Sequence, residues 1–201
     1  MSDKWNETET YMEKFYNNAQ NKIPSNILDE IHKIDFRNIP KGQPRQTNKE
    51  LRLILRSSGW TNHSFRANSS KFSLDDFKDD IGLERQFRTY RDLVYDVLKL
   101  QLGYNLGELK AGVIINYDEN VKVKGGNSPY IQELDRKIEE FQEVINFDIP
   151  LLVIGLKEKT FLAQKEVPER HVKYPAKDRG PSDQRYLEKL RRKRALERAK
   201  K

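Results

Sequence analysis

Apolar and polar residues alternate on both sides of a short polar break, Lys78-Asp79-Asp80. Alternation of period two that is interrupted by such a break predicts a β-hairpin. The simplest closure is a two-residue loop at Asp79 and Asp80, which places Asp75 across from Glu84 and leaves Gln86 further along the same face. The opposite face is expected to carry five apolar side chains suited to a core: Phe72, Leu74, Ile81, Leu83 and Phe87.

Upstream of the hairpin, the spacing of apolar residues predicts helices. An N-terminal helix is expected from residues at roughly helical intervals: Trp5, Tyr11, Met12, Phe15 and Tyr16. Ser25 is expected to cap a second helix. Residues 39–47 contain two prolines and a glycine and are expected to form a loop. Thr47 or Asn48 would then cap a third helix that ends at Gly59.

Downstream, Thr89 followed by Asp92 predicts the start of another helix. This helix is expected to show one apolar stripe, which serves the core or a dimer contact, and to end at two glycines: Tyr90, Leu93, Val94, Val97, Leu98 and Leu102, then Gly103 and Gly107. Residues 111–117 and 149–156 are apolar runs that predict buried strands, with a helix between them. Such a strand–helix–strand unit implies a parallel crossover. The predicted fold class is therefore α/β, with a mixed central β-sheet flanked by helices.

Composition narrows the class of protein. The 201 residues suit one domain with a real core, and the absence of cysteine excludes a disulfide scaffold and thiolate metal sites. His32, His63 and His171 show no ligand spacing. No signal sequence and no apolar run of membrane length are present, so a soluble, cytoplasmic protein without a membrane partner is expected.

The positive charge is concentrated at the C-terminus. Of the net +7, residues 185–201 supply nine basic and two acidic side chains, which leaves 29 of each sign elsewhere. Such an arm suits a polyanion as partner, although a solvated helix kept for solubility explains it as well. We expect a catalytic domain over residues 1–160 and a loop with a basic helical arm over 161–201.

The hairpin carries the candidate chemistry. Opposed side chains on one face have Cβ atoms about 4.5–5.5 Å apart, where like charges are destabilising, so Asp75 and Glu84 need a proton or a cation between them. Oxygen ligands suit Mg²⁺, which can polarise a phosphoryl oxygen and acidify a water molecule. A solvated acidic hairpin that binds nothing is the alternative at this point.

The same residues resemble a known motif. Asp75, eight intervening residues and Glu84-Arg85-Gln86 are similar to the D…ExQ variant of the PD-(D/E)xK nuclease motif found in type II restriction endonucleases of the BglII/BstYI-like group. The likeness extends along residues 74–96, including a later Tyr-Asp, and more loosely over residues 41–156. The resemblance implies a restriction-endonuclease-like core and Mg²⁺-dependent cleavage of double-stranded DNA at a short palindromic site, possibly GATC-containing, by a homodimer of bacterial or archaeal origin.

The resemblance also implies roles for individual residues. Asp75, Glu84 and the backbone carbonyl of Arg85 would bind the metal ion, and Gln86 would position the attacking water. Basic residues in the loops and at helix starts are expected to contact DNA: Lys41, Arg45, Lys78, Arg88, Arg91, Lys122 and Lys124. No nucleotide cofactor is expected, because no lysine-serine pair follows the glycines after Lys124.

Two departures from the family pattern and a second candidate carboxylate keep alternatives open. Position 86 is glutamine where the commoner signature has lysine, and position 88 is arginine where the BstYI-like pattern has glycine. Asp76 is a second candidate for the first carboxylate, but strand alternation places it on the face with Leu83, which favours Asp75. A DNA-binding protein without catalysis, or an RNA-associated protein that uses its basic arm, would also fit the charge distribution.

Overall fold

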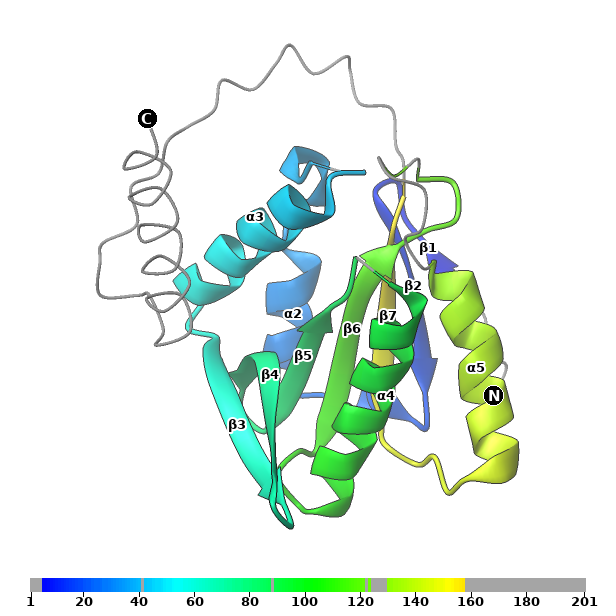
Figure 1. The fold of residues 1–201 in the computed structure, drawn as a ribbon. Helices are drawn as coiled ribbons and strands as arrows, with labels where there is room; N and C mark the ends of the chain where they lie inside the picture. The colour runs from blue at the N-terminus through cyan, green and yellow to red at the C-terminus, as the bar shows by residue number, and fades with distance from the viewer. Residues whose placement is uncertain (1–4, 41, 88, 122, 124–129, 158–201) are drawn as a thin grey trace, which may run out of the picture. The chain divides into compact units, whose positions relative to one another are not determined.

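The computed structural model describes residues 5–40, 42–87, 89–121, 123 and 130–157, which fall within the first of two compact units of the chain, Met1–Leu162. This unit is built on one seven-stranded sheet in the order β1-β2-β7-β6-β5-β4-β3 (Figure 1). The strands are β1 (Asn6–Glu7), β2 (Tyr11–Tyr16), β3 (Thr61–Ala67), β4 (Ser70–Lys78), β5 (Ile81–Arg85), β6 (Ala111–Tyr117) and β7 (Leu151–Leu156).

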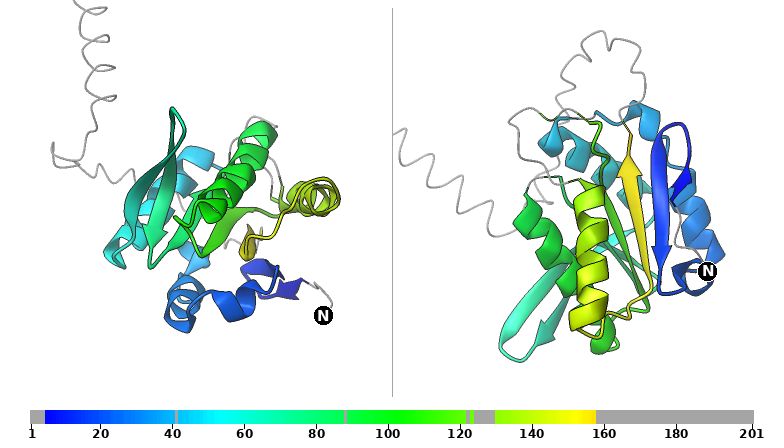
Figure 2. Two further views of the ribbon diagram at one scale, coloured as in Figure 1. Left: turned by 90° about the horizontal axis from the view of Figure 1, so that it is seen from below. Right: turned by 90° about the vertical axis from the view of Figure 1, so that its right-hand side faces the viewer.

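Helices cover both faces of the sheet, as Figures 1 and 2 show from three directions. They are α1 (Ala19–Lys22), α2 (Ser25–His32), the 3₁₀ helix η1 (Phe36–Asn38), α3 (Pro44–Ser57), α4 (Tyr90–Asn105) and α5 (Ile131–Val144). One hydrophobic core lies between the sheet and α2 with α3, and a second lies between the sheet and α4 with α5. The mixed, helix-flanked sheet confirms the predicted fold class.

The central part of the sheet has the predicted connections. Residues Asp79 and Asp80 both adopt positive φ angles, 50° and 63°, as a type I′ turn requires. Asp76 pairs with Leu83 and Lys78 with Ile81, which confirms the register of the hairpin. Strands β5, β6 and β7 run parallel to one another.

The prediction of an N-terminal helix was wrong. Residues 11–16 form strand β2, which pairs antiparallel with β7 along its whole length. Met12 and Tyr16 pack into the core on the α4 side, whereas Tyr11 and Phe15 pack against the other core. The apolar spacing is therefore that of a strand covered on both faces.

Strand β4 departs from the predicted alternation of faces. Leu74 belongs to the core on the α4 side, and Ile81 and Leu83 belong to the opposite core, so the single apolar face expected for the hairpin was wrong. The cause is an irregularity between β3 and β4: Thr61 pairs with Phe77, but His63 pairs with Leu74, so β4 contains one additional residue. A β-bulge of this kind re-aims the side chains beside it, here Asp75 and Asp76.

Several helix ends also differ from the prediction. Helix α3 begins at Pro44, which suits the first helical turn because proline lacks an N–H, so neither Thr47 nor Asn48 caps it. Ser25 is the first residue of α2 and makes no cap bond; the cap position is Pro24. Gly103 lies inside α4, whereas the predicted cap at Thr89, whose side chain accepts from the Asp92 N–H, is confirmed. None of the described helices is long and apolar enough to cross a membrane.

Candidate active site

The two carboxylates of the motif come from adjacent strands and differ in exposure. Glu84 lies near the end of β5, and its side chain is only 3% exposed. The side chain of Asp75 on β4 is 42% exposed. The Arg85 N–H donates to Asp75 Oδ2 at 3.0 Å, which fixes the aspartate beside the peptide that joins Glu84 to Arg85. One carboxylate is thus buried and the other is open to a ligand.

Helix α4 contributes two charged residues that sequence reasoning did not assign to the site. Lys99 Nζ lies 2.8 Å from Glu84 Oε1 and 2.9 Å from Asp96 Oδ1. Gln86 Nε2 donates to Asp96 Oδ2 at 3.0 Å. Asp96 was part of the Tyr-Asp element of the resemblance, but Lys99 carried no such signal. These contacts join two motif residues, Glu84 and Gln86, to one turn of α4.

Burial and charge shift the pKa values of this cluster. Burial, and then repulsion from Asp96, raise the pKa of Glu84 well above its usual value, although Lys99 opposes the shift. Burial also raises the pKa of Asp96. Burial alone would lower the pKa of Lys99, but Glu84 and Asp96 outweigh it and the pKa is raised. Lys99 therefore keeps its positive charge and pairs with two carboxylates.

Asp76 has different surroundings, although it is next to Asp75. Its side chain is fully buried and pairs with Arg85 Nε at 2.7 Å, with Arg56 Nε 3.5 Å away. Arg85 also donates to the backbone carbonyl of Asn48 at 2.6 Å, which ties the hairpin to α3. Burial raises the pKa of Asp76 to about 6 despite both arginines. These contacts make Asp76 a structural anchor and support Asp75 as the first carboxylate of the motif.

The residues expected to contact DNA fall into two groups. Lys41, Arg88, Lys122 and Lys124 lie outside the described residues. The other three can be placed. Arg45 is exposed in the first turn of α3, not in a loop as expected, and Arg91 is exposed in the first turn of α4. Lys78 Nζ contacts Glu30 Oε1 at 2.5 Å and donates to the Ser58 carbonyl at 2.8 Å. Contact with DNA stays a prediction for all seven.

The residues present fit a hard divalent cation. The donors at the hairpin are carboxylate oxygens, and the carboxylates of Asp75, Glu84 and Asp96 repel one another. Lys99 pairs with Glu84 and Asp96, and the Arg85 guanidinium lies 3.9 Å from Asp75. An added cation would relieve that repulsion. Within the described residues no group of three or more acidic, histidine or cysteine side chains is arranged to hold a metal. Two carboxylates, a backbone carbonyl and water molecules would match the usual coordination of Mg²⁺.

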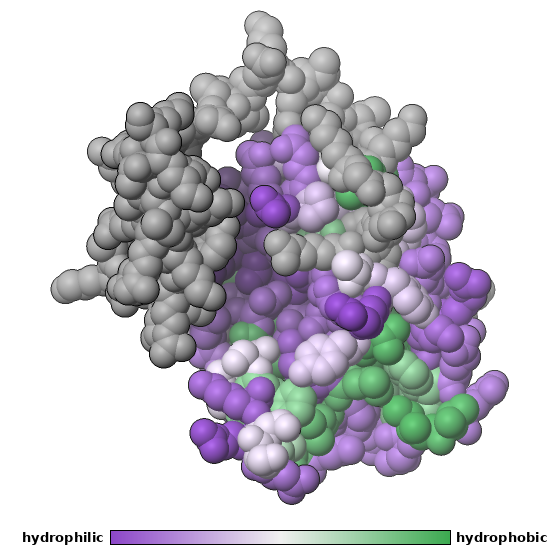
Figure 3. Space-filling model, viewed as in Figure 1, coloured by the Kyte–Doolittle hydropathy of each residue, from purple (hydrophilic) through white to green (hydrophobic). Residues whose placement is uncertain are grey.

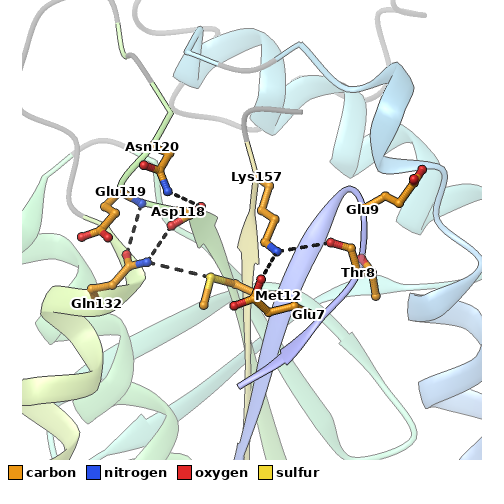
Figure 4. A pocket seen from close by; sticks show the side chains of 9 residues that line it. All are labelled: Glu7, Thr8, Glu9, Met12, Asp118, Glu119, Asn120, Gln132 and Lys157. Carbon is orange, nitrogen blue, oxygen red and sulfur yellow. Dashed lines mark hydrogen bonds and ion pairs between the residues drawn. The ribbon is translucent and has the colours of Figure 1, made fainter. Parts of the chain in front are cut away.

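A separate pocket lies at the ends of β6 and β7 (Figure 4). Its lining is acidic, with a single lysine: Glu7, Thr8, Glu9, Met12, Asp118, Glu119, Asn120, Gln132 and Lys157. Gln132 donates to Asp118 at 2.6 Å, and Lys157 pairs with Glu7 at 2.5 Å. None of the predicted site residues lines it. A pocket with this charge is poorly suited to phosphate, so the hairpin remains the better site for DNA chemistry.

Comparisons with known proteins point to one group. A family model described as restriction endonuclease BglII/BglIII matches residues 2–156. The crystal structure of the restriction endonuclease BglII complexed with a DNA 16-mer is similar, with a TM-score of 0.66 and 20% identity over 74% of this chain and 77% of that one. Free BglII gives a TM-score of 0.58 and 19% identity over 73% and 78%. Among curated proteins no sequence matches significantly.

Proposed function

The chain belongs to the BglII/BglIII family of restriction endonucleases, and we propose that it hydrolyses both strands of duplex DNA at a short palindromic site containing GATC, using Mg²⁺ held by Asp75 and Glu84. Membership of this family makes it a type II site-specific deoxyribonuclease, which sets aside the RNA-associated and non-catalytic alternatives. The observation that supports the metal assignment is the exposed Asp75 carboxylate, bonded at 3.0 Å to the N–H of the residue after Glu84.

Each residue would have a distinct task in the reaction. Asp75 offers an open carboxylate to the ion, and Glu84 a second one whose position Lys99 fixes. The backbone carbonyl of Arg85 would be a further ligand. When bound, Mg²⁺ supplies polarisation of the phosphoryl oxygen and acidifies a neighbouring water. Gln86, held by Asp96, would orient the water for in-line attack at phosphorus.

Contacts to DNA would come from both sides of the hairpin. Arg45 and Arg91 lie in the first turns of α3 and α4, where backbone N–H groups and an arginine together suit a phosphate. Lys41, Arg88, Lys122 and Lys124 are proposed as further contacts. Lys78 is the weaker proposal, because Glu30 already neutralises it.

Digestion of a bacteriophage DNA tests the proposal. We expect discrete fragments in Mg²⁺ and none in EDTA, and sequencing of the fragment ends should give one palindrome that contains GATC. A different palindrome would refute only the sequence assignment. A smear without defined ends, or uniform binding without cleavage in any divalent metal, would refute the function.

The enzyme is also proposed to act as a homodimer, because two-fold symmetric subunits suit a palindromic site. Figure 3 shows apolar surface on the face that carries α4 and α5. On α4, Tyr95 is 52% exposed and Leu98 39%, so part of the predicted apolar stripe is available for contact with a second subunit. Sedimentation velocity should report a dimer for the parent and a monomer for Leu98→Glu. A monomeric parent at the concentration of the cleavage assay would contradict this part.

A further inference from the structure

The motif lacks its usual lysine, but a lysine is present at the site from another element. We propose that Lys99 of α4 supplies the positive charge that the commoner motif carries at the position of Gln86. Lys99 would act as a positioning residue for cleavage, through Glu84 and Asp96. The inference rests on the proposed function, since it assigns a role within that active site.

Three contacts support this role. The ammonium of Lys99 bridges Glu84 and Asp96 at 2.8 and 2.9 Å, with the lysine side chain only 8% exposed. Asp96 in turn accepts the hydrogen bond of Gln86 at 3.0 Å. Positions 86 and 99 therefore converge on one carboxylate. A lysine at position 86 would have the length to reach Asp96, so either position can place a cation at the same point.

Lys99 lies where α4 packs closely against β5, the strand that carries Glu84. It lies one residue before Leu100, which is buried against Gly82 of β5, so α4 approaches the strand closely at this turn. Burying an ammonium group costs free energy unless it is paired with a negative charge. Here both partners of Lys99, Glu84 and Asp96, belong to the proposed active site. The fixed charge would keep Glu84 from turning away and would not require metal to do so.

A purely structural ion pair is the competing explanation, and the chain contains a matched example. Lys14 of β2 pairs with Asp135 of α5 at 2.7 Å, and its side chain is also 8% exposed. None of the motif residues contacts Lys14 among the described interactions. Lys14→Gln therefore removes a buried lysine pair of similar geometry away from the motif.

The test compares Lys99→Gln, Lys14→Gln and the double variant Gln86→Lys/Lys99→Gln at saturating Mg²⁺ and at a temperature where all are folded. We expect Lys99→Gln to lower the single-turnover cleavage rate about a hundredfold with little change in KM for DNA, as for loss of one preorganised charge. Lys14→Gln should stay within about threefold of the parent, because it lowers stability without touching the site. The double variant Gln86→Lys/Lys99→Gln should cleave at least about tenfold faster than Lys99→Gln, because it returns a cation to the site. If Lys99 served only the stability of the fold, a lysine at position 86 would not raise the cleavage rate.

Two results would overturn the inference: Lys99→Gln cleaving at the parental rate, or a slow Lys99→Gln that Gln86→Lys does not improve. Both differ from failure of the proposed function, in which the parent itself makes no specific cuts. Thermal unfolding of each variant separates loss of fold from loss of rate.

Discussion

Replacing Asp75 by asparagine is expected to slow DNA cleavage by about a thousandfold or more with almost no loss of stability. The change removes the charge of one of two proposed metal ligands, and a bound cation contributes several kcal/mol to the transition state, where about 1.4 kcal/mol corresponds to a tenfold change in rate. Stability should be spared because the side chain is 42% exposed and the asparagine oxygen can still accept from the Arg85 N–H. Single-turnover cleavage and thermal unfolding of the same preparation measure both effects.

Asp79→Asn is the matched control. It makes the same isosteric change in the same hairpin, at a turn residue with positive φ, a conformation that asparagine adopts readily. Its cleavage rate should stay close to that of the parent. Should Asp75→Asn cut DNA normally while Asp76→Asn does not, the first ligand would be Asp76 and the assignment above would be wrong.

The hairpin could be predicted because its determinants are local. A polar break at Asp79-Asp80 and alternation on either side define turn and register without reference to the rest of the chain. Alternation also favours Asp75 over Asp76 as the first carboxylate, because it places Asp76 on the face with Leu83. The burial of Asp76 could not be predicted in this way. It depends on one additional residue in β4 relative to β3, and on contacts with one arginine of β5 and one of α3.

Strand β2 and the role of Lys99 were missed for a related reason. Tertiary packing decides whether a segment forms a helix or a strand, and which face of a helix is buried. Residues 11–16 have apolar side chains at spacings compatible with a helix or with a strand covered on both faces. Antiparallel pairing with β7 selects the strand. In α4 the expected stripe is confirmed at Leu93 and Val97, which are buried, but not at Tyr90 and Leu98, which are exposed. Leu100, Asp96 and Lys99 are buried instead, so the buried face of α4 includes the two charged residues of the site.

Asp76→Ala is expected to have the largest effect on stability, about 3–5 kcal/mol, the range found when one partner of a buried ion pair is removed. The substitution leaves Arg85, whose side chain is 5% exposed, without its partner at 2.7 Å. Chemical denaturation near pH 8 measures the change, with Asp35→Ala as control. Asp35 pairs with Arg37 on the surface, with side chains 42% and 73% exposed, and accepts the Arg37 N–H at the start of η1. Its loss should cost about 0.5–2 kcal/mol, less than the loss of Asp76.

Substitutions of the two aspartates should therefore have opposite effects on stability and activity. Asp75→Asn should be stable and inactive, whereas Asp76→Ala should be unstable and should keep part of its activity at low temperature, where the folded fraction persists. Asp76→Asn should cost less than Asp76→Ala, because the amide oxygen can still accept from Arg85 Nε. If Asp76→Ala unfolds at the same denaturant concentration as the parent, Arg85 finds other partners, and the anchoring role of Asp76 between β4, β5 and α3 is refuted.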